Sequence, residues 1–387
     1  MHSLDPPPQR QYYYINTDSA LRKLLNHMRQ TARIALDTEA DSLHHYFEKV
    51  CLIQVTLDRI NYIVDPLSGI NLSQFLSILS DKPLVLHGAD YDLRMLRITY
   101  SFRADRDVSD TMLAAQLLGY EQFGLAALVQ RFFETTLTKS GQKSDWSRRP
   151  LSQKQLEYAS NDTRFLEPLA KTLHGQLHKL GRWDWYRETC ARMVESTKHN
   201  SFLRDSENAW RIKGWSSLDR RQLAFLRQIW NWREHEAKRA DLPPFRVMNN
   251  QQIIDLAVWS ASHPKGSLAE GPKLPRHMRG HRLERLQKII RVAQKIPESQ
   301  WPEKQRQKFP TYLEPDLKQI IEDLQTECSL RAEELNITPP ALAPRAALVT
   351  IARNRPVNIK EIMACGLMRW QATILEPRVR GILKKYE

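Results

Sequence analysis

The sequence predicts an α/β domain followed by two small all-α domains. Short apolar runs typical of strands dominate the first 90 residues, and runs with helical spacing follow to about residue 175. Strand signals almost vanish from about residue 205 onward. The length of 387 residues suits two or three domains. We expect one domain over residues 1–200, a second over 205–298, a linker over 299–313 and a third over 314–387.

The first domain is predicted to contain a sheet that helices cover on its faces. Strand-like segments come first, among them "RIALD", "VCLIQVTL", "INYIVD" and "PLVLHG". Helical patterns such as "YDLRMLRI" and "GLAALVQRFF" lie between and after them, and the last stretch, through "LEYASNDTRFL", is helical throughout. A few consecutive strands, then alternating strands and helices, then helices alone fit an α/β layer architecture.

The two helical segments have similar layouts about 100 residues apart, although their sequences are only weakly alike. Each begins with a long helical pattern, "LDRRQLAFLRQIWNWREHEAKRADL" in one and "EPDLKQIIEDLQTECSLRAEEL" in the other. A proline-containing loop and a short helical pattern follow in both. We therefore expect two small helical domains in tandem.

Positive charge is concentrated in the middle of the chain. The formal net charge is +14, yet residues 1–175 hold 20 basic and 20 acidic residues. Residues 176–310 hold 27 basic and 14 acidic residues, whereas residues 311–387 hold 11 and 10. A concentrated positive segment favours binding to a polyanion, with a solvated basic surface as the alternative. We expect the middle segment, and not the last one, to supply most nucleic-acid affinity.

Cysteine usage and hydropathy indicate a soluble protein of the cytoplasm. The four cysteines are far apart and show no zinc-binding spacing, which favours reduced thiols. The N-terminal sequence lacks the pattern of a secretory signal, and no apolar stretch approaches the roughly 18–20 residues that a membrane span needs. We expect a cytoplasmic location and no membrane partner.

Acidic residues follow or flank several apolar runs of the first domain. Asp37 and Glu39 lie one residue apart in "IALDTEA", so a strand would project both from one face, where they repel. Asp92 begins a helical pattern, and Tyr158 and Asp162 lie one helical turn apart. Taken singly, these features have ordinary explanations: a solvated strand end, a helix cap and a surface pair.

Taken together, the four carboxylates predict a metal site. Four acids at one site cannot all stay ionised without cations, because each negative charge raises its neighbours' pKa. Oxygen ligands without cysteine or histidine select Mg²⁺ or Mn²⁺ rather than zinc. Two such ions, about 3.5–4 Å apart, activate a water molecule and stabilise the departing oxygen in phosphodiester cleavage.

The motifs "DTEA", "HGADYD" and "YASND" resemble, in order and spacing, the three exonuclease motifs of the DEDD superfamily, in its tyrosine-containing subgroup. The surrounding segments, such as "KSGQKSDWSRRPLSQKQLEYASND", resemble ribonuclease D. Residues from about 210 to 295 are similar to the HRDC domain, and those from about 315 to 385 to a more diverged copy. The resemblance covers nearly the whole chain.

The resemblance implies an RNase H-like fold with a mixed sheet and two-metal hydrolysis of RNA from a free 3′ end. The products would be nucleoside 5′-monophosphates, the substrates tRNA precursors and other structured RNAs, and no nucleotide cofactor would be needed. Asp37 would bridge both metals, Glu39 and Asp162 would complete the nucleophile's metal site, and Asp92 would serve the second metal. Tyr158 would orient the attacking water, since a phenol with a pKa near 10 is a poor base.

Eight further residues are candidates for contacting nucleic acid. His87 directly precedes "GAD", and a loop around "SDW" carries three basic residues. Four arginines at a spacing of three would form a basic stripe on a helix. A histidine at a strand end is often structural, and a basic stripe is often only a solvated face. Besides His87, the candidates are Lys139, Lys143, Arg148, Arg276, Arg279, Arg282 and Arg285.

Two other functions compete with RNA trimming. A DNA 3′→5′ exonuclease is one, because the same four acids hydrolyse either polymer. The tandem helical domains, and the absence of a polymerase or helicase segment, favour RNA. A catalytically inactive nucleic-acid-binding protein is the other, although every member of the acidic and tyrosine set is present in the sequence.

Overall fold

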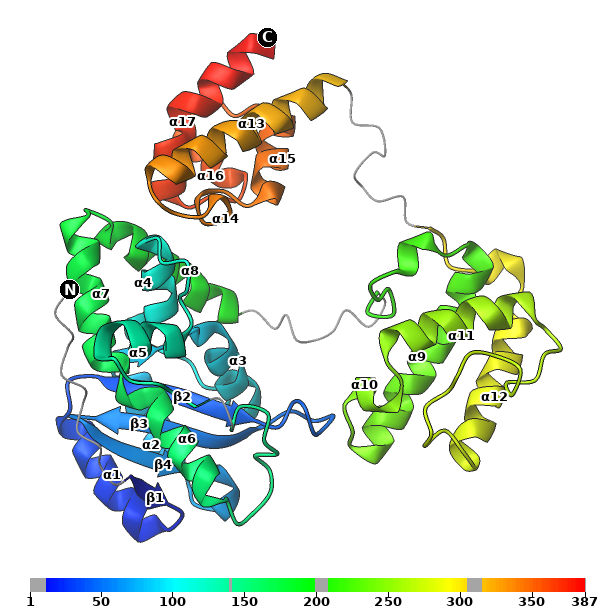
Figure 1. Ribbon diagram of the computed structural model, residues 1–387, viewed down its shortest axis with the longest axis horizontal. Coiled ribbons are helices and arrows are strands. Elements are labelled where there is room, and N and C mark those ends of the chain that lie inside the picture. Colours follow the sequence, from blue (N-terminus) through cyan, green and yellow to red (C-terminus); the bar gives the residue numbers. More distant parts are fainter. Residues whose placement is uncertain (1–11, 139–140, 199–207, 305–314, 387) are drawn as a thin grey trace. The chain divides into compact units, whose positions relative to one another are not determined.

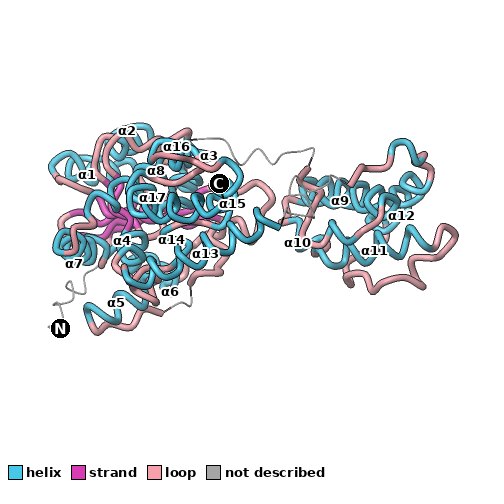
Figure 2. The backbone as a smooth tube through the Cα atoms, turned by 90° about the horizontal axis from the view of Figure 1, so that it is seen from above, coloured by secondary structure: helices cyan, strands magenta, loops and turns pink. Residues whose placement is uncertain are grey.

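A computed structural model describes residues 12–138, 141–198, 208–304 and 315–386. The chain divides into two compact units. The first contains residues Met1–Ala40, Lys49–His199 and Tyr312–Glu387, and the second contains Asp41–Glu48 and Asn200–Thr311. Figure 2 shows strands gathered in the first unit, and helices and loops in the second.

A six-stranded mixed sheet forms the centre of the first unit (Figure 1). The strand order is β1-β4-β3-β2-β5-β6. The neighbours β2, β3 and β4 pair antiparallel, whereas β1 with β4, β2 with β5 and β5 with β6 pair parallel. The mixed sheet confirms the predicted α/β class. The strands are β1 (Tyr13–Ile15), β2 (Ile34–Ala40), β3 (Val50–Leu57), β4 (Ile60–Val64), β5 (Leu84–Leu86) and β6 (Val108–Asp110).

Strand β2 shows how the alternation of side chains separates the core from the site. Ile34 and Leu36 are buried against the helices on one face of the sheet. Ala35 points to the other face, where it packs with Leu166. Because side chains alternate along a strand, Asp37 and Glu39 lie on the Ala35 face. The same strand therefore supplies core contacts from one side and carboxylates from the other.

Eight α-helices surround this sheet among the described residues. Helices α1, α2 and α3 supply side chains to the hydrophobic core on the Leu36 face, while α6 packs on the other face against β2, β3 and β4. Helix α6 begins with a capping box between Ser152 and Gln155. The helices are α1 (Asp18–Gln30), α2 (Ser73–Ser80), α3 (Ala89–Tyr100), α4 (Thr111–Leu117), α5 (Leu125–Phe133), α6 (Gln153–Arg164), α7 (Leu166–Lys179) and α8 (Trp183–Lys198).

The C-terminal helices belong to the same compact unit as the sheet. Their core joins the cluster formed by α4, α5, α7 and α8, and the rings of Trp185 and Trp370 stack with centroids 4.8 Å apart. Glu188 of α8 accepts hydrogen bonds from the backbone N–H groups of Arg369 and Trp370 at the start of α17. These helices are α13 (Pro315–Glu334), α14 (Pro339–Leu342), α15 (Arg345–Asn354), α16 (Ile359–Ala364) and α17 (Arg369–Leu383).

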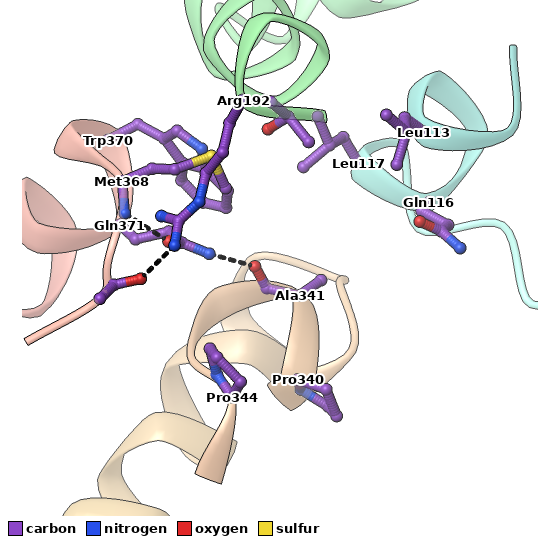
Figure 3. A pocket seen from close by; sticks show the side chains of 12 residues that line it. Leu113, Gln116, Leu117, Arg192, Pro340, Ala341, Pro344, Met368, Trp370 and Gln371 are labelled. Atoms are coloured by element: carbon purple, nitrogen blue, oxygen red, sulfur yellow. Dashed lines mark hydrogen bonds between the residues drawn. The ribbon is translucent and has the colours of Figure 1, made fainter. Parts of the chain in front are cut away.

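A cavity of about 290 Å³ lies where α4 and α8 meet the C-terminal helices (Figure 3). On its wall the guanidinium of Arg192 donates to the carbonyl oxygen of Gly366 at 2.7 Å. The Gln371 amide donates to the carbonyl oxygen of Ala341 at 2.8 Å. The sequence led us to expect two helical domains in tandem. In the structure, however, the last helical segment packs on the first domain.

The second unit is helical and has its own core. Phe225, Ile229, Leu256 and Leu286 pack together in it. The segment Asp41–Glu48, which follows β2, contributes to this unit through hydrogen bonds such as that from the Tyr46 backbone N–H to Asp241. The helices are α9 (Arg220–Ala240), α10 (Pro244–Val247), α11 (Asn250–Ser262) and α12 (His281–Gln294).

The four cysteines, Cys51, Cys190, Cys328 and Cys365, are all buried free thiols. Over the part of the chain that the structure describes, no helix combines the length and the apolar character needed to cross a bilayer.

Candidate active site

Three carboxylates converge where β2 faces α6. Ligand oxygens of Asp37, Glu39 and Asp162 all lie within 4.8 Å of one another. Strand alternation places the first two on one face, and packing of α6 on that face brings the third to them. Each of these three residues is partly exposed as a whole, so the cluster lies near the surface. The structure thus joins acids that lie more than 120 positions apart in the sequence.

Asp92 is held beside this cluster by the backbone of β2. It lies in the first turn of α3 and is only 6% exposed. One oxygen of its carboxylate accepts hydrogen bonds from the Thr38 backbone N–H at 3.0 Å and the Thr38 hydroxyl at 2.6 Å. Since Thr38 lies between Asp37 and Glu39, these bonds tie the fourth carboxylate to the strand that carries the first two.

Burial and mutual repulsion make the four acids hard to ionise. Burial, and then the charges of Asp162 and Asp92, raise the pKa of Glu39 to about 9. Burial and Asp92 raise the pKa of Asp162 to about 8, and burial raises that of Asp92 to about 7 despite the Thr38 bonds. The pKa of Asp37 also lies well above its usual range, through burial and its three acidic neighbours. Such a cluster needs positive charge to stay ionised at neutral pH.

The donor set fits divalent cations. Its ligands are carboxylate oxygens, which Mg²⁺ and Mn²⁺ prefer. Moreover, the Oδ2 atom of Asp162 is buried without a hydrogen-bond partner among the described residues. A buried oxygen without a partner is costly, and a bound cation would satisfy it. The arrangement therefore indicates the use of divalent metal.

Tyr158 lies one turn before Asp162 on α6. Its ring packs near that of Trp146, with centroids 6.0 Å apart, and directly against Gly141. A Cβ atom at Gly141 would lie 2.5 Å from the Cγ of Tyr158, so a glycine is needed there. Burial and the charges of Asp162, Glu39 and Asp37 raise the pKa of Tyr158. The phenol therefore stays protonated, and can donate a hydrogen bond but not act as a base.

His87 is part of the hydrogen-bonded network that positions α3. Its Nδ1 atom lies 2.9 Å from the Thr111 hydroxyl, and burial lowers its pKa. The neighbouring Asp110 accepts hydrogen bonds from the backbone N–H groups of Gly88 and Ala89. The structural explanation considered from the sequence therefore accounts for the contacts of His87.

Sequence reasoning missed an ion pair that holds the loop before α6. Arg149 donates two hydrogen bonds to the Asp65 carboxylate, at 2.7 and 2.6 Å, and others to the carbonyl oxygens of Trp146 and Cys51. The hydroxyl of Tyr14 also donates to Asp65. Asp65 at the end of the apolar run "INYIV" was the available signal, but nothing in the sequence indicates its partner 84 positions away.

The basic loop candidates differ in their surroundings. Arg148 is exposed and forms an ion pair with Asp145 at 3.0 Å, and Lys143 is exposed as well. Lys139 lies outside the described residues. Trp146 is fully buried, as expected of a packing anchor.

The expected basic stripe on one helix is wrong. Helix α12 begins at His281, after Gly280 with φ 57° and ψ −143°, so Arg276 and Arg279 precede the helix. Arg282 and Arg285 are on the helix but form ion pairs with Glu236 of α9, at 3.4 and 2.5 Å. A break at glycine and a buried acid on the facing helix therefore divide the four arginines into two exposed and two structural residues.

Comparison with protein families identifies the class of the two parts. Residues 12–178 match the family of 3′-5′ exonucleases, and residues 222–262 match the HRDC domain. Together with the mixed sheet and its acidic cluster, these matches define a 3′-5′ exonuclease domain joined to an HRDC domain.

Relatives that align along most of the chain give a more specific identification. Ribonuclease D of Pseudomonas paraeruginosa is 28% identical over 88% of this chain and 89% of its own length. Ribonuclease D of Musicola paradisiaca is 26% identical over 97% of this chain and 99% of its own. The protein is therefore a hydrolytic 3′→5′ exoribonuclease that is similar to ribonuclease D along most of its length.

Solved structures support the same fold. The structure of Escherichia coli RNase D, described as an exoribonuclease involved in structured RNA processing, matches with a TM-score of 0.72 and 24% identity. The match covers 97% of this chain and all of that one. A protein from Bifidobacterium adolescentis matches with a TM-score of 0.82 and 22% identity, over 98% and 99% of the two chains.

Proposed function

We propose that Asp37, Glu39, Asp92 and Asp162 hold two divalent cations, Mg²⁺ or Mn²⁺, that serve hydrolysis of RNA from its 3′ end. The observation that carries this proposal is the convergence of three carboxylates within 4.8 Å, beside a fourth that is bonded to the same strand. Two-ion sites of this kind are suited to in-line cleavage of phosphodiesters.

The bound cations would supply the charge that activates a water molecule and stabilises the leaving oxygen. The residues of this chain would position the reactants. Asp37 and Glu39 present their carboxylates from a rigid central strand, and Thr38 fixes Asp92. Tyr158, which stays protonated, would donate a hydrogen bond to the attacking water and orient it. With this role for Tyr158, we assign the protein to the tyrosine-containing subgroup, and its products would be nucleoside 5′-monophosphates.

The substrates that we propose are tRNA precursors and other structured RNAs with a free 3′ end. The surplus of basic residues between positions 176 and 310 supports a polyanionic partner, and the E. coli relative is described as acting in structured RNA processing. The exposed residues Arg148, Arg276, Arg279 and Lys143 would contact phosphates. We place the enzyme in the cytoplasm.

We also propose that the C-terminal helices form a second HRDC-like domain. Both helical segments begin with a long helix, α9 or α13. A four-residue helix that starts at a proline, α10 or α14, and then another helix follow in each. The domain boundaries proposed are 1–200, 205–298 and 314–387, with a linker between the last two. The shared order of elements supports common ancestry of the two segments.

An end-labelled tRNA with a 3′ extension tests this function. Wild-type protein with Mg²⁺ or Mn²⁺ should shorten the extension one nucleotide at a time, and Asp37→Ala should not. The matched control is Asp58→Ala, which removes a carboxylate at a strand end outside the cluster. Equal trimming by wild type and Asp37→Ala would refute the assigned site, and faster digestion of a matched DNA strand would refute the substrate.

A further inference from the structure

Gln54 carries a buried amide beside the candidate metal site. It lies in the middle of β3, is only 1% exposed, and pairs directly with Asp37 across the antiparallel β2–β3 ladder. Side chains of directly paired residues project from the same face of a sheet with Cβ atoms about 4.5–5.5 Å apart. The amide of Gln54 and the carboxylate of Asp37 are therefore neighbours under α6.

Both polar atoms of this amide lack a hydrogen-bond partner among the described residues. The backbone cannot satisfy them readily, because β3 is paired on both sides, to β2 and to β4. The cross-strand neighbour of Gln54 on β4 is Ile63, which has no polar side-chain atom. Among its two direct cross-strand neighbours, Asp37 alone can bond to the amide.

The carboxylate of Asp37, in turn, lacks a hydrogen-bond donor among the described residues. Asp92 receives two hydrogen bonds from Thr38, whereas no hydrogen bond to the Asp37 side chain occurs within the described ranges. Other polar side chains on β3 are satisfied: the hydroxyl of Thr56, two residues along on the same face, bonds to Asn61 and to Thr163. An unused donor thus lies next to an unused acceptor, at the residue that would bridge the cations.

We propose that Gln54 is a positioning residue of the metal site, whose amide N–H donates to the carboxylate of Asp37 when cations are bound and fixes the orientation of that carboxylate. The inference rests on the proposed metal site. Groups that orient a metal ligand in this way typically change metal affinity by about 10- to 100-fold. The other buried side chains of β3 are apolar or already hydrogen-bonded. The need for a donor beside Asp37 explains why this strand also contains a buried amide without another partner.

Calorimetric titration of Mn²⁺ into the full chain, without nucleic acid, tests the proposal. Gln54→Leu keeps most of the side-chain volume but removes the donor. We expect it to bind Mn²⁺ about 10- to 100-fold more weakly while its melting temperature without metal stays equal or rises, because an unsatisfied buried amide is replaced by an apolar group. Gln54→Met, with a similar unbranched shape, replaces it if the leucine variant does not fold.

Thr56→Val is the matched control, since it removes a buried polar group from the same face of the same strand. It breaks the bonds to Asn61 and Thr163, so it should lower the melting temperature and leave Mn²⁺ affinity unchanged. Unchanged affinity in Gln54→Leu, with wild type binding Mn²⁺ and Asp37→Ala not binding, would overturn the role of Gln54 alone. No binding by wild type would overturn the proposed metal site, and the inference with it.

Discussion

At the scale of single residues, the site follows from two periodicities. Alternation along β2 places Asp37 and Glu39 on one face, and the four-residue spacing on α6 places Tyr158 one turn from Asp162. These positions could be predicted from the sequence because they depend on local geometry. Gln54 and the Arg149–Asp65 pair could not, because their significance depends on partners that only the folded sheet brings near.

The hydroxyl of Tyr158 provides a test at this scale. Tyr158→Phe should lower kcat by about 100-fold, since it removes a group that orients the attacking water, and should leave Mn²⁺ affinity unchanged. Single-turnover trimming of an end-labelled RNA measures the first quantity and calorimetry the second. Tyr120→Phe also loses one hydroxyl hydrogen bond, to Gln176, away from the carboxylates, and should trim at the wild-type rate. A wild-type rate in Tyr158→Phe would remove the tyrosine from the mechanism.

The raised pKa values of the acids predict an unusual pH dependence of stability. The metal-free folded protein retains protons on Asp92, Asp162 and Glu39 up to pH values of about 7, 8 and 9, whereas the unfolded chain loses them near pH 4. Between these limits the folded state binds more protons, so the free energy of unfolding falls as pH rises. Melting temperatures in a chelator should therefore decrease from about pH 5 to pH 9.

Substitution and metal binding distinguish the contribution of the carboxylates to this pH dependence from that of other titrating groups. Asp162→Asn should flatten this decrease, because the amide does not titrate. Saturating Mg²⁺ should also flatten it, because the cation stabilises the ionised form. A slope identical in wild type and Asp162→Asn would contradict the raised pKa of Asp162.

At the scale of elements, close packing sets where α6 and the loop before it can lie. Gly141 contacts the ring of Tyr158, and Arg149 ties the same loop to Asp65. The helix α6 was predictable from its apolar spacing and a loop was expected before it, whereas the contacts that fix this loop were not predictable. The failure of the arginine stripe has the same origin: uniform spacing in sequence does not guarantee a continuous helix, and Gly280 interrupts it.

Gly141→Ala tests whether the loop positions Tyr158. An added Cβ would overlap the tyrosine ring and displace it, so kcat should fall, by up to about 100-fold for a displacement near 1 Å. Mn²⁺ affinity should not change, because the nearest atoms to the added Cβ belong to Tyr158 and not to a carboxylate. Gly175→Ala, where an added Cβ meets nothing within 4 Å, is the control and should be fully active. Full activity in Gly141→Ala would show that the contact does not matter.

At the scale of the whole molecule, the nearly neutral C-terminal segment has a structural role that the sequence did not indicate. The sequence of an amphipathic helix shows that one face is buried, but not which element covers that face. The structure places α17 against α8 through Trp185 and Trp370, and Arg182 donates to the carbonyl oxygens of Leu117 and Leu335. The expectation that this segment contributes little to nucleic-acid affinity stays a prediction, but its removal should affect stability.

Truncation after residue 310 should therefore destabilise the sheet-containing unit. A milder version is Trp370→Ala, which removes a 6% exposed side chain and should cost about 3–5 kcal/mol of unfolding free energy. Chemical denaturation measures both. Leu330→Ala, on the exposed surface of α13, should change stability by less than about 0.5 kcal/mol. Wild-type stability in Trp370→Ala and in the truncated chain would show that the segment folds independently of the first domain.

We propose that the carboxylates of β2, α3 and α6 form one metal site. Crystals soaked in Mn²⁺, with anomalous scattering recorded at the manganese edge, test it most directly. We predict two anomalous peaks among Asp37, Glu39, Asp92 and Asp162, and their loss in Asp37→Ala. Peaks only elsewhere, or an Mn²⁺-soaked crystal with no peak between these four residues, would refute the assignment of the metal site.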